Sequence, residues 1–369
     1  MTASLQRATL ALTRRKFIVF AVVVVVLSVV VPLTVALAAD LYLHRRAERS
    51  AGLNRWGYRG PVVGRKAAGE IRVAMLGGST AFGYGVTWDE AIPAQLERVL
   101  NEHTSAPPAR VVNLGYNNEG AYAFLSTLQD FEFLDADIAV FYEGYNDLAG
   151  DDGVNRAVFR HKSAVFRLTG YFPILPLALV EKARSLRYGG DLEKAYAAAR
   201  NAPGSQTVFR PNLAARTSAA ALEAADAVSN SLGRQLDRMA ATPQAPVAST
   251  TEAGCASPWT QYCQSIYVAT RYALERGQAV AIAAQPRKVF EDKARHDSQQ
   301  VALQGMIARH FGNDPRVRYV DLRDTVDLRN LHIAFDGMHL DAGGNRTVAR
   351  ALAPAVRDLA AVLAVAAAR

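Results

Sequence analysis

"RVAMLGGSTAFGYG", residues 72–85, joins an apolar run to two glycines, Ser79 and Thr80. The run has the length and composition of a buried strand, and a helical pattern follows the turn. Functional sites in open α/β sheets lie at the carboxyl ends of strands, so this turn is the first candidate site. Its glycines fit three interpretations: a phosphate-binding loop, a dinucleotide fingerprint, or a turn that presents a nucleophilic serine.

The spacing of the loop excludes the first two interpretations. A P-loop needs a lysine directly after its second glycine, but Tyr84 follows Gly83. A dinucleotide fingerprint needs G-x-G-x-x-G, whereas Gly77 and Gly78 are adjacent. The nucleophile elbow G-x-S-x-G does not match either, because Ala81 stands at its last glycine. What remains is a serine at a strand end, which needs a base to become a nucleophile.

Strand-like and helix-like patterns alternate from residue 71 onward. Such alternation predicts an α/β fold in which helices cover both faces of a parallel sheet. The predicted strands are 71–76, 110–115, 137–144, 279–286 and 317–322, and the predicted helices are 89–103, 120–134, 290–311 and 342–365.

The interval 151–277 interrupts this alternation. It begins with an unusually apolar part, becomes rich in alanine, and carries a patch of Pro, Ser and Thr at 242–258. We interpret it as a helical insertion into the domain formed by residues 70–369, not as a separate domain. Its stretch FPILPLAL (172–179) is either core or a lid that lies at a membrane surface.

An uncharged apolar segment, Phe17–Ala39, precedes the globular part. As a helix, its 23 residues can cross a bilayer core of roughly 30 Å. A cleaved signal peptide is the alternative, because Ala36–Ala38 (ALA) matches a cleavage pattern, but the apolar region exceeds the usual length of roughly 7–15 residues. We therefore expect a transmembrane anchor at 17–39, with residues 1–16 in the cytoplasm, a connector at 40–69, and the remaining chain across the membrane.

The charge distribution and the cysteine content indicate which partners and which cellular compartment we expect. The formal net charge is +8, but the basic residues are scattered and form no nucleic-acid motif, so we expect no nucleic-acid partner. Those that flank the apolar segment suit lipid headgroups. The two cysteines, Cys255 and Cys263, can form a disulfide in an oxidising compartment; the alternative is two free thiols. No further Cys or His lies near enough in the sequence to complete a metal site.

A base for Ser79 is found near the carboxyl end of the chain. Of seven histidines, His339 lies in "FDGMHLDAGGNRTVARAL", three residues after Asp336. A carboxylate at this spacing can orient the imidazole and stabilise its charged form. Donors for a developing oxyanion follow the next two predicted strands: Asn146 in "YEGYNDLAG", and Gly115 or Gly120 in "NLGYNNEGA". The Ser79 backbone N–H is the third donor.

This set of residues resembles the SGNH (GDSL-like) hydrolase superfamily, in its bacterial membrane-anchored branch. The matching blocks are "LGGST" with Ser79, "NNEGA" with Gly120, "GYND" with Asn146, and "DGMH" with Asp336 and His339. The aspartate that usually precedes the serine in this family is here Gly78. Extra residues separate Asn113 from Gly120, and Gly120 is preferred over Gly115 as the donor of the second block.

The resemblance implies a three-layer α/β/α sandwich of the flavodoxin-like SGNH type and acyl transfer without metal or cofactor. Ser79 is the implied nucleophile, His339 the base and Asp336 its orienting acid, while Ser79, Gly120 and Asn146 form the oxyanion hole. We expect a serine esterase at the bacterial inner membrane, with its catalytic domain on the periplasmic side, acting on acyl esters of envelope or exopolysaccharide glycans or on a lipid. The alternatives are an O-acyltransferase on the same site, or a non-catalytic glycan-binding protein.

Overall fold

A computed structural model describes residues 2–47, 53–102, 108–152, 158–179, 252–287 and 293–367. These residues fall into two compact units, which are described separately: residues 2–45 with 174–179, and a body formed by residues 46–173 and 252–367. Most of the predicted insertion, residues 180–251, lies outside the described residues.

The body is built on a five-stranded sheet in the order β2-β1-β3-β4-β5, with every neighbouring pair parallel. Apolar runs without alternation form the central strands, because both faces of a parallel sheet are covered. All residues of β3 and β4 are buried accordingly. The strands are β1 (Ile71–Gly77), β2 (Ala109–Asn113), β3 (Ile138–Tyr142), β4 (Ala279–Ala284) and β5 (Val317–Asp321).

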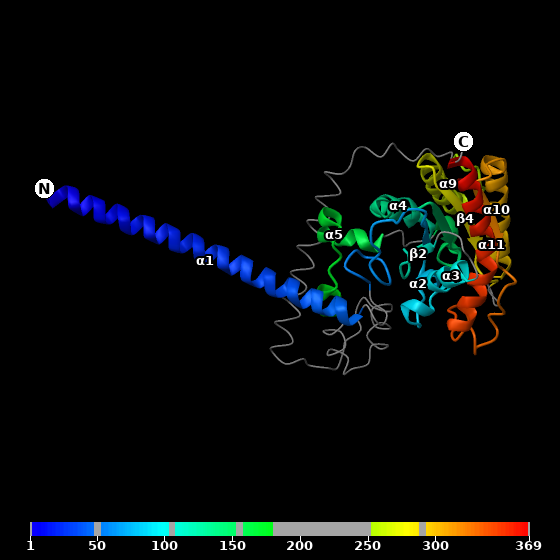
Figure 1. Cartoon of the computed structure of the whole chain (residues 1–369), viewed down its shortest axis with the longest axis horizontal. Helices are drawn as coiled ribbons and strands as arrows, with labels where there is room; N and C mark the ends of the chain where they lie inside the picture. The colour runs from blue at the N-terminus through cyan, green and yellow to red at the C-terminus, as the bar shows by residue number, and fades with distance from the viewer. Residues whose placement is uncertain are drawn as a thin grey trace. The chain divides into compact units, whose positions relative to one another are not determined.

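Helices cover the sheet in two layers, which confirms the predicted α/β/α sandwich (Figure 1). Helices α3 (Ile92–Asn101) and α11 (Ala342–Ala367) pack against each other on one face of the sheet. The other layer contains α4 (Phe124–Asp130), α9 (Thr260–Glu275) and α10 (Lys293–Phe311). Helix α9 falls within the interval 151–277 and forms the crossover from β3 to β4.

Short helical turns connect these elements near the strand ends. Several of them position the candidate site, since they follow β1, β2 and β3 directly. They are α2 (Ser79–Phe82), η1 (Trp88–Glu90), η2 (Ala121–Ala123), η3 (Glu132–Leu134), η4 (Tyr145–Asp147), η5 (Gly150–Asp152), η6 (Phe159–Lys162) and α5 (Ala164–Thr169).

The strand order reverses between β1 and β3, because the chain runs from β1 outward to β2 and then returns past β1 to β3. Such a switch point leaves a crevice at the carboxyl ends of the strands, where ligands of doubly wound folds bind. Ser79 follows β1, Gly120 follows β2 and Asn146 follows β3. The topology alone therefore brings these three residues to one edge of the sheet.

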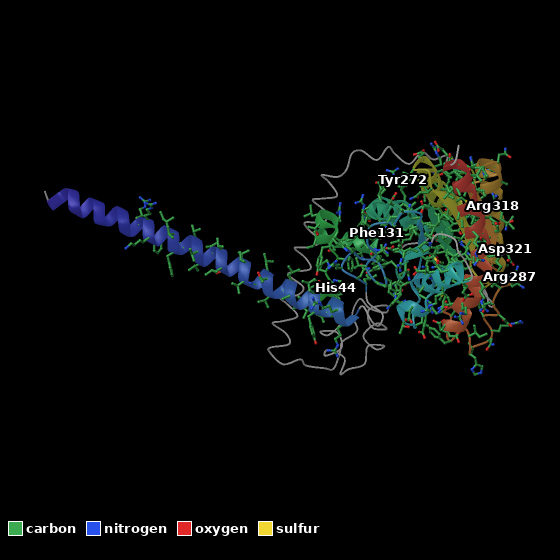
Figure 2. The ribbon with its side chains drawn as sticks, in the orientation of Figure 1. His44, Phe131, Tyr272, Arg287, Arg318 and Asp321 are labelled. Atoms are coloured by element: carbon green, nitrogen blue, oxygen red, sulfur yellow. A yellow bond between two sulfur atoms is a disulfide. The ribbon has the colours of Figure 1, made fainter. Side chains whose placement is uncertain are left out.

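The N-terminal helix α1 runs from Thr2 to Ala47 without interruption at Pro32. Among the described residues, the part from Arg14 to Arg46 is long and apolar enough to cross a membrane, by length and composition. His44 lies near the carboxyl end of α1 (Figure 2). Within this unit the buried Asp40 accepts the backbone N–H groups of Ile174 (2.8 Å) and Leu175 (2.5 Å). The carboxylate thus ties residues 174–175 to the end of the apolar helix.

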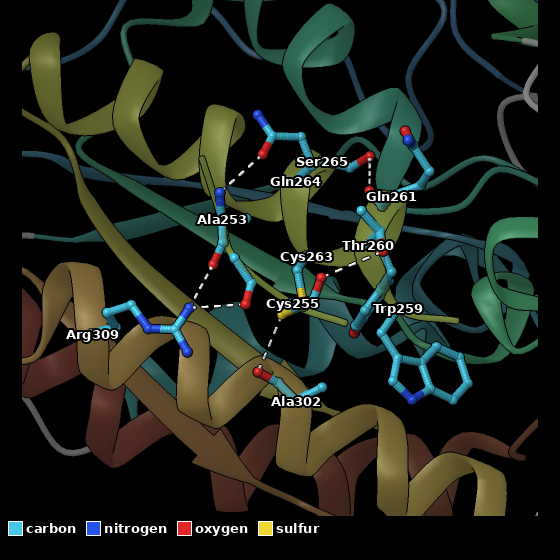
Figure 3. Close-up of a disulfide and its surroundings, with 12 residues drawn as sticks. Ala253, Cys255, Trp259, Thr260, Gln261, Cys263, Gln264, Ser265, Ala302 and Arg309 are labelled. Atoms are coloured by element: carbon cyan, nitrogen blue, oxygen red, sulfur yellow. Dashed lines mark hydrogen bonds between the residues drawn. A yellow bond between two sulfur atoms is a disulfide. The ribbon is translucent and has the colours of Figure 1, made fainter. Parts of the chain in front are cut away.

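A disulfide between Cys255 and Cys263 joins the segment before α9 to the first turn of that helix (Figure 3). On the same segment, the Arg309 side chain donates to the carbonyls of Ala253 (3.1 Å) and Gly254 (3.0 Å). Gly254 adopts a left-handed conformation there, with φ at +68°. The pair predicted from sequence is thus a cross-link at the start of the β3–β4 crossover helix.

Candidate active site

Ser79 begins the short helix α2, directly after the glycines that end β1. Its hydroxyl lies 2.8 Å from His339 Nε2, across 260 positions of sequence. Gly83 ends α2 in a left-handed conformation, with φ at +87°, and donates its N–H to the Ser79 carbonyl. The glycines on both sides therefore hold Ser79 on one tight turn, half-buried and in contact with an imidazole.

His339 is held from its other nitrogen by Asp336. The distance from His339 Nδ1 to the carboxylate is 2.6 Å, and the second carboxylate oxygen accepts the backbone N–H groups of Met338 (3.0 Å) and His339 (2.7 Å). Partial burial acts to raise the pKa of Asp336, but these hydrogen bonds and the nearby imidazole lower it below its usual value. Asp336 is therefore a charged group that fixes the tautomer of the ring, and Nε2 can accept the proton of Ser79.

Two exposed aromatic rings flank the imidazole. The Tyr84 ring centroid lies 4.9 Å from that of His339, and the Phe335 ring is stacked on the imidazole at 6.1 Å. About half of Tyr84 (52%) and of Phe335 (44%) remains open to solvent. A side chain at Gly85 would overlap Phe335, so the glycine allows this ring to approach. The rings leave flat apolar surface beside Ser79 that the sequence alone did not single out.

Asn146 lies on η4, where its Nδ2 donates to the Glu119 carbonyl at 2.7 Å. Asp147, the next residue, accepts the backbone N–H of Ala121 at 2.9 Å. These two bonds join the end of β3 to the loop that carries Gly120. The Asn146 amide retains a second N–H, so it can serve a ligand oxygen as well.

Gly115 and Gly120 differ in what their surroundings allow. The Gly115 N–H donates to the Asn113 side chain at 3.0 Å, so that donor is already used. Gly120 adopts an extended conformation at the start of η2, and a Cβ there would lie 2.7 Å from an Asp147 carboxylate oxygen. Of the two glycines, Gly120 remains the better candidate for an oxyanion donor.

The buried Arg160 side chain stabilises the loop between β2 and Gly120. Its fully buried guanidinium donates to the carbonyls of Gly57 (2.9 Å), Leu114 (2.6 Å) and Gly115 (3.3 Å), and pairs with Glu119 at 3.4 Å. The same group lies over the rings of Tyr116 and Phe131, at 4.9 Å and 5.2 Å from their centroids; Phe131 is labelled in Figure 2. Sequence reasoning missed Arg160, because its partners lie far apart along the chain.

Glu143 is a second buried residue that sequence reasoning missed. It ends the β3 run in "YEGYND", and its Oε1 accepts the backbone N–H groups of Gly144 (3.1 Å) and Asn146 (3.2 Å). Burial, followed by the charge of Asp147, raises the pKa of Glu143 to about 8. The position directly before "GYND" was the available signal, since a carboxyl at the end of a buried strand is costly unless it has a purpose.

Three of the predicted site residues thus form a continuous chain, Asp336–His339–Ser79, and Asn146 and Gly120 lie on the two neighbouring loops. This arrangement can transfer the serine proton to the imidazole and supply hydrogen-bond donors to an oxyanion. Within the described ranges, no group of three or more His, Cys, Asp or Glu side chains could hold a metal ion.

Comparison with solved structures finds several esterases of low sequence identity. A family 3 carbohydrate esterase from Clostridium thermocellum is 13% identical, with 80% of this chain and 99% of that chain covered and a TM-score of 0.37. A GDSL-like lipase from Bacteroides thetaiotaomicron is 12% identical, with coverages of 80% and 92% and a TM-score of 0.38. An acetylxylan esterase from Geobacillus stearothermophilus, solved as a catalytic mutant, is 11% identical, with coverages of 78% and 94% and a TM-score of 0.38.

The family comparison is more specific. Residues 75–267 match the GDSL-like lipase/acylhydrolase family, a range that includes Ser79, Gly120 and Asn146. None of the curated proteins matches the chain. The matched range exceeds half of the 369 residues, and the sheet order is that of the fold implied by the resemblance. The protein is therefore an ester-hydrolysing enzyme that belongs to the GDSL-like lipase/acylhydrolase family.

Proposed function

We propose that the protein is a membrane-anchored serine esterase that works through an acyl-enzyme on Ser79. The observation that carries this proposal is the hydrogen-bonded chain from Asp336 through His339 to the Ser79 hydroxyl, at 2.6 and 2.8 Å. A serine hydroxyl is a weak nucleophile until a base accepts its proton, and this imidazole is in contact with it.

The reaction follows from these contacts. Ser79 Oγ attacks the ester carbonyl while its proton passes to His339 Nε2, and the carbonyl oxygen becomes an oxyanion. The N–H groups of Ser79 and Gly120 and the Asn146 amide stabilise that charge. The imidazolium then protonates the leaving alcohol, which departs and leaves the acyl group on Ser79. Water, deprotonated by the same imidazole, releases the acid and regenerates the serine.

We infer that the substrate is an O-acyl ester of a cell-envelope or exopolysaccharide glycan, with a lipid ester as the alternative. Support comes from the exposed rings of Tyr84 and Phe335 that lie beside His339. Such rings offer flat apolar faces on which the C–H face of a sugar can pack. The apolar helix α1 supports an anchor that retains the body at the inner membrane on the periplasmic side, and the disulfide fits an oxidising compartment.

The first prediction concerns the nucleophile. The full-length protein in detergent should hydrolyse 4-nitrophenyl acetate, and Ser79→Ala should lower kcat by a factor on the order of a thousand or more, because the acyl-enzyme cannot form. A fluorophosphonate probe should label the wild type on the peptide that contains Ser79. Ser265→Ala is the matched control, since that hydroxyl donates to the Gln261 carbonyl within α9 at 2.8 Å, far along the chain from Ser79. Equal turnover by wild type and Ser79→Ala would reject the proposal.

A further inference from the structure

Glu143 has no role in the mechanism above, yet it lies at the centre of the loops that carry it out. It is almost completely buried, and its Oε2 makes no hydrogen bond of normal geometry with the described residues, although the nearby Gly78 N–H acts to lower the pKa of the carboxyl. Burial removes the hydration of a carboxyl group, which is unfavourable unless hydrogen bonds or a change of protonation compensate for it. A buried carboxyl with an unpartnered oxygen at an active site therefore calls for a functional explanation.

The geometry around Gly78 provides that explanation. A Cβ built on Gly78 would overlap Asn146 Nδ2, and would lie 2.8 Å from Glu143 Oε2 and 2.9 Å from the Glu119 carbonyl. A side chain at position 78 would therefore meet the Asn146 amide first, and then the Glu143 carboxyl and the Glu119 carbonyl.

The other oxygen of Glu143 acts on the oxyanion loop. Because Oε1 accepts the N–H groups of Gly144 and Asn146, the carboxyl closes the turn η4 on which Asn146 lies. The Asn146 side chain then reaches over Gly78 to the Glu119 carbonyl. Glu143 therefore contacts the supports of two oxyanion donors, Asn146 directly and Ser79 through Gly78.

We infer that Glu143 is a positioning residue for the esterase reaction: directly after β3, its carboxyl lies against Gly78 and holds the turn that carries Asn146 against the Ser79 loop. This inference rests on the proposed function. A glycine stands at position 78 because the Asn146 amide, followed by the Glu143 carboxyl, lies where a side chain would begin.

The protonation of Glu143 gives this role a measurable signature. Burial and the charge of Asp147 raise the pKa of Glu143 to about 8, although the Gly144, Asn146 and Gly78 N–H groups act to lower it. At pH 7 the group is therefore mostly neutral, and it becomes negative above pH 8. A negative charge beside the oxyanion hole opposes formation of the oxyanion, so activity should fall as Glu143 ionises.

The phenols that surround Glu143 do not titrate in that range. Burial raises the pKa of the neighbouring phenols well above 10, so these stay neutral. Asp147 on η4 contributes the nearby negative charge, and His296 on α10 contacts the ring of Tyr145 at 5.5 Å. The phenols that face Glu143 are Tyr142 on β3, Tyr145 on η4, Tyr262 on α9 and Tyr122 on η2.

The test compares Glu143→Gln with the wild type in the full-length protein, using 4-nitrophenyl acetate from pH 6 to 9.5 after subtraction of uncatalysed hydrolysis. The glutamine carbonyl can accept the same two N–H groups, so kcat/KM at pH 7 should remain within about threefold. The decline of activity above pH 8 should disappear, because the glutamine cannot ionise. An unchanged alkaline decline in Glu143→Gln would overturn the inference.

A second variant tests the hold of Glu143 on Asn146. Glu143→Ala should lower kcat about tenfold or more, with a smaller change in KM, because the Gly144 and Asn146 N–H groups lose their acceptor. A wild-type kcat in Glu143→Ala would overturn the inference. A wild type no faster than Ser79→Ala would overturn the proposed function as well, whereas an active wild type with either contrary result overturns only the role of Glu143.

Discussion

At the scale of single residues, the site depends on which atom of each side chain is already used. His339 Nδ1 is committed to Asp336, which leaves Nε2 for Ser79. In the same way, the Gly115 N–H is committed to Asn113, which favours Gly120 as a donor. The role of each site residue therefore depends less on its residue type than on which of its polar atoms already has a hydrogen-bond partner.

The prediction at this scale concerns Asp336. Replacing Asp336 with asparagine should lower kcat by a factor on the order of a hundred to ten thousand, because a neutral amide no longer stabilises the imidazolium or fixes its tautomer. Asp341→Asn is the matched control: that carboxylate accepts the Gly344 N–H at 2.7 Å at the start of α11, and asparagine caps a helix equally well. Steady-state kinetics with 4-nitrophenyl acetate measure both variants, and a wild-type kcat in Asp336→Asn would contradict the assigned role.

At the scale of elements, the loops after β2 and β3 are fixed by buried polar side chains. The turn η6 contributes Arg160, which bonds the carbonyls at the end of β2. The turn η4 is closed by Glu143, and Asp147 on η4 accepts the Ala121 N–H of η2. The strands bring the loops to one edge of the sheet, and these buried polar side chains then set their conformation.

Arg160→Met should therefore destabilise the fold. The substitution keeps an apolar stem but leaves three carbonyls and the buried Glu119 without their donor, which should cost roughly 3–5 kcal/mol of the free energy of unfolding. The control Arg318→Met changes a guanidinium on β5 that donates to the carbonyl of its neighbour Val317, and its free energy of unfolding should stay within about 0.5 kcal/mol of the wild type. Urea unfolding followed by tryptophan fluorescence measures both variants, and equal midpoints would show that Arg160 is not a structural support.

At the scale of the whole molecule, two features lie outside the catalytic chemistry. The apolar helix α1 and the cross-link Cys255–Cys263 both bear on where the enzyme works. Bilayer insertion needs a long uncharged helix, and a stable disulfide needs an oxidising compartment. Together they motivate the proposal of an anchored enzyme whose body lies outside the cytoplasm.

The whole-molecule prediction is that the N-terminal segment is retained. In a bacterial host the protein should remain in the membrane pellet after alkaline carbonate extraction, and its intact mass should include residues before Ala39. The variant Ala38→Leu, which removes the small residue of the ALA pattern, should give the same fraction and the same processing state. If the wild type is cleaved after Ala38 while Ala38→Leu stays full-length, the segment is a cleaved signal peptide instead. Thiol labelling of Cys255 and Cys263 only after reduction is the expected companion result.

The sequence by itself determined the elements, the residue types of the site and the apolar N-terminal segment. Apolar runs placed the five strands, and the structure confirms the parallel sheet that they predicted. "GGST", "GYND" and "DGMH" each carry a local pattern, so the candidates Ser79, Asn146, Asp336 and His339 could be named without coordinates. Local periodicity and spacing suffice for features of this kind.

Only the tertiary structure decided what lies around those residues. The burial of Glu143 beside Gly78, the use of the Gly115 N–H by Asn113, and the contacts of Arg160 with three distant carbonyls join parts of the chain with no common pattern. The physical reason is that desolvation and hydrogen-bond satisfaction depend on everything that packs around a group, whereas a sequence pattern reports only its own segment. The opening glycines illustrate the difference: the sequence shows a glycine at position 78, and the fold shows that the Asn146 amide and the Glu143 carboxyl lie where a side chain there would begin.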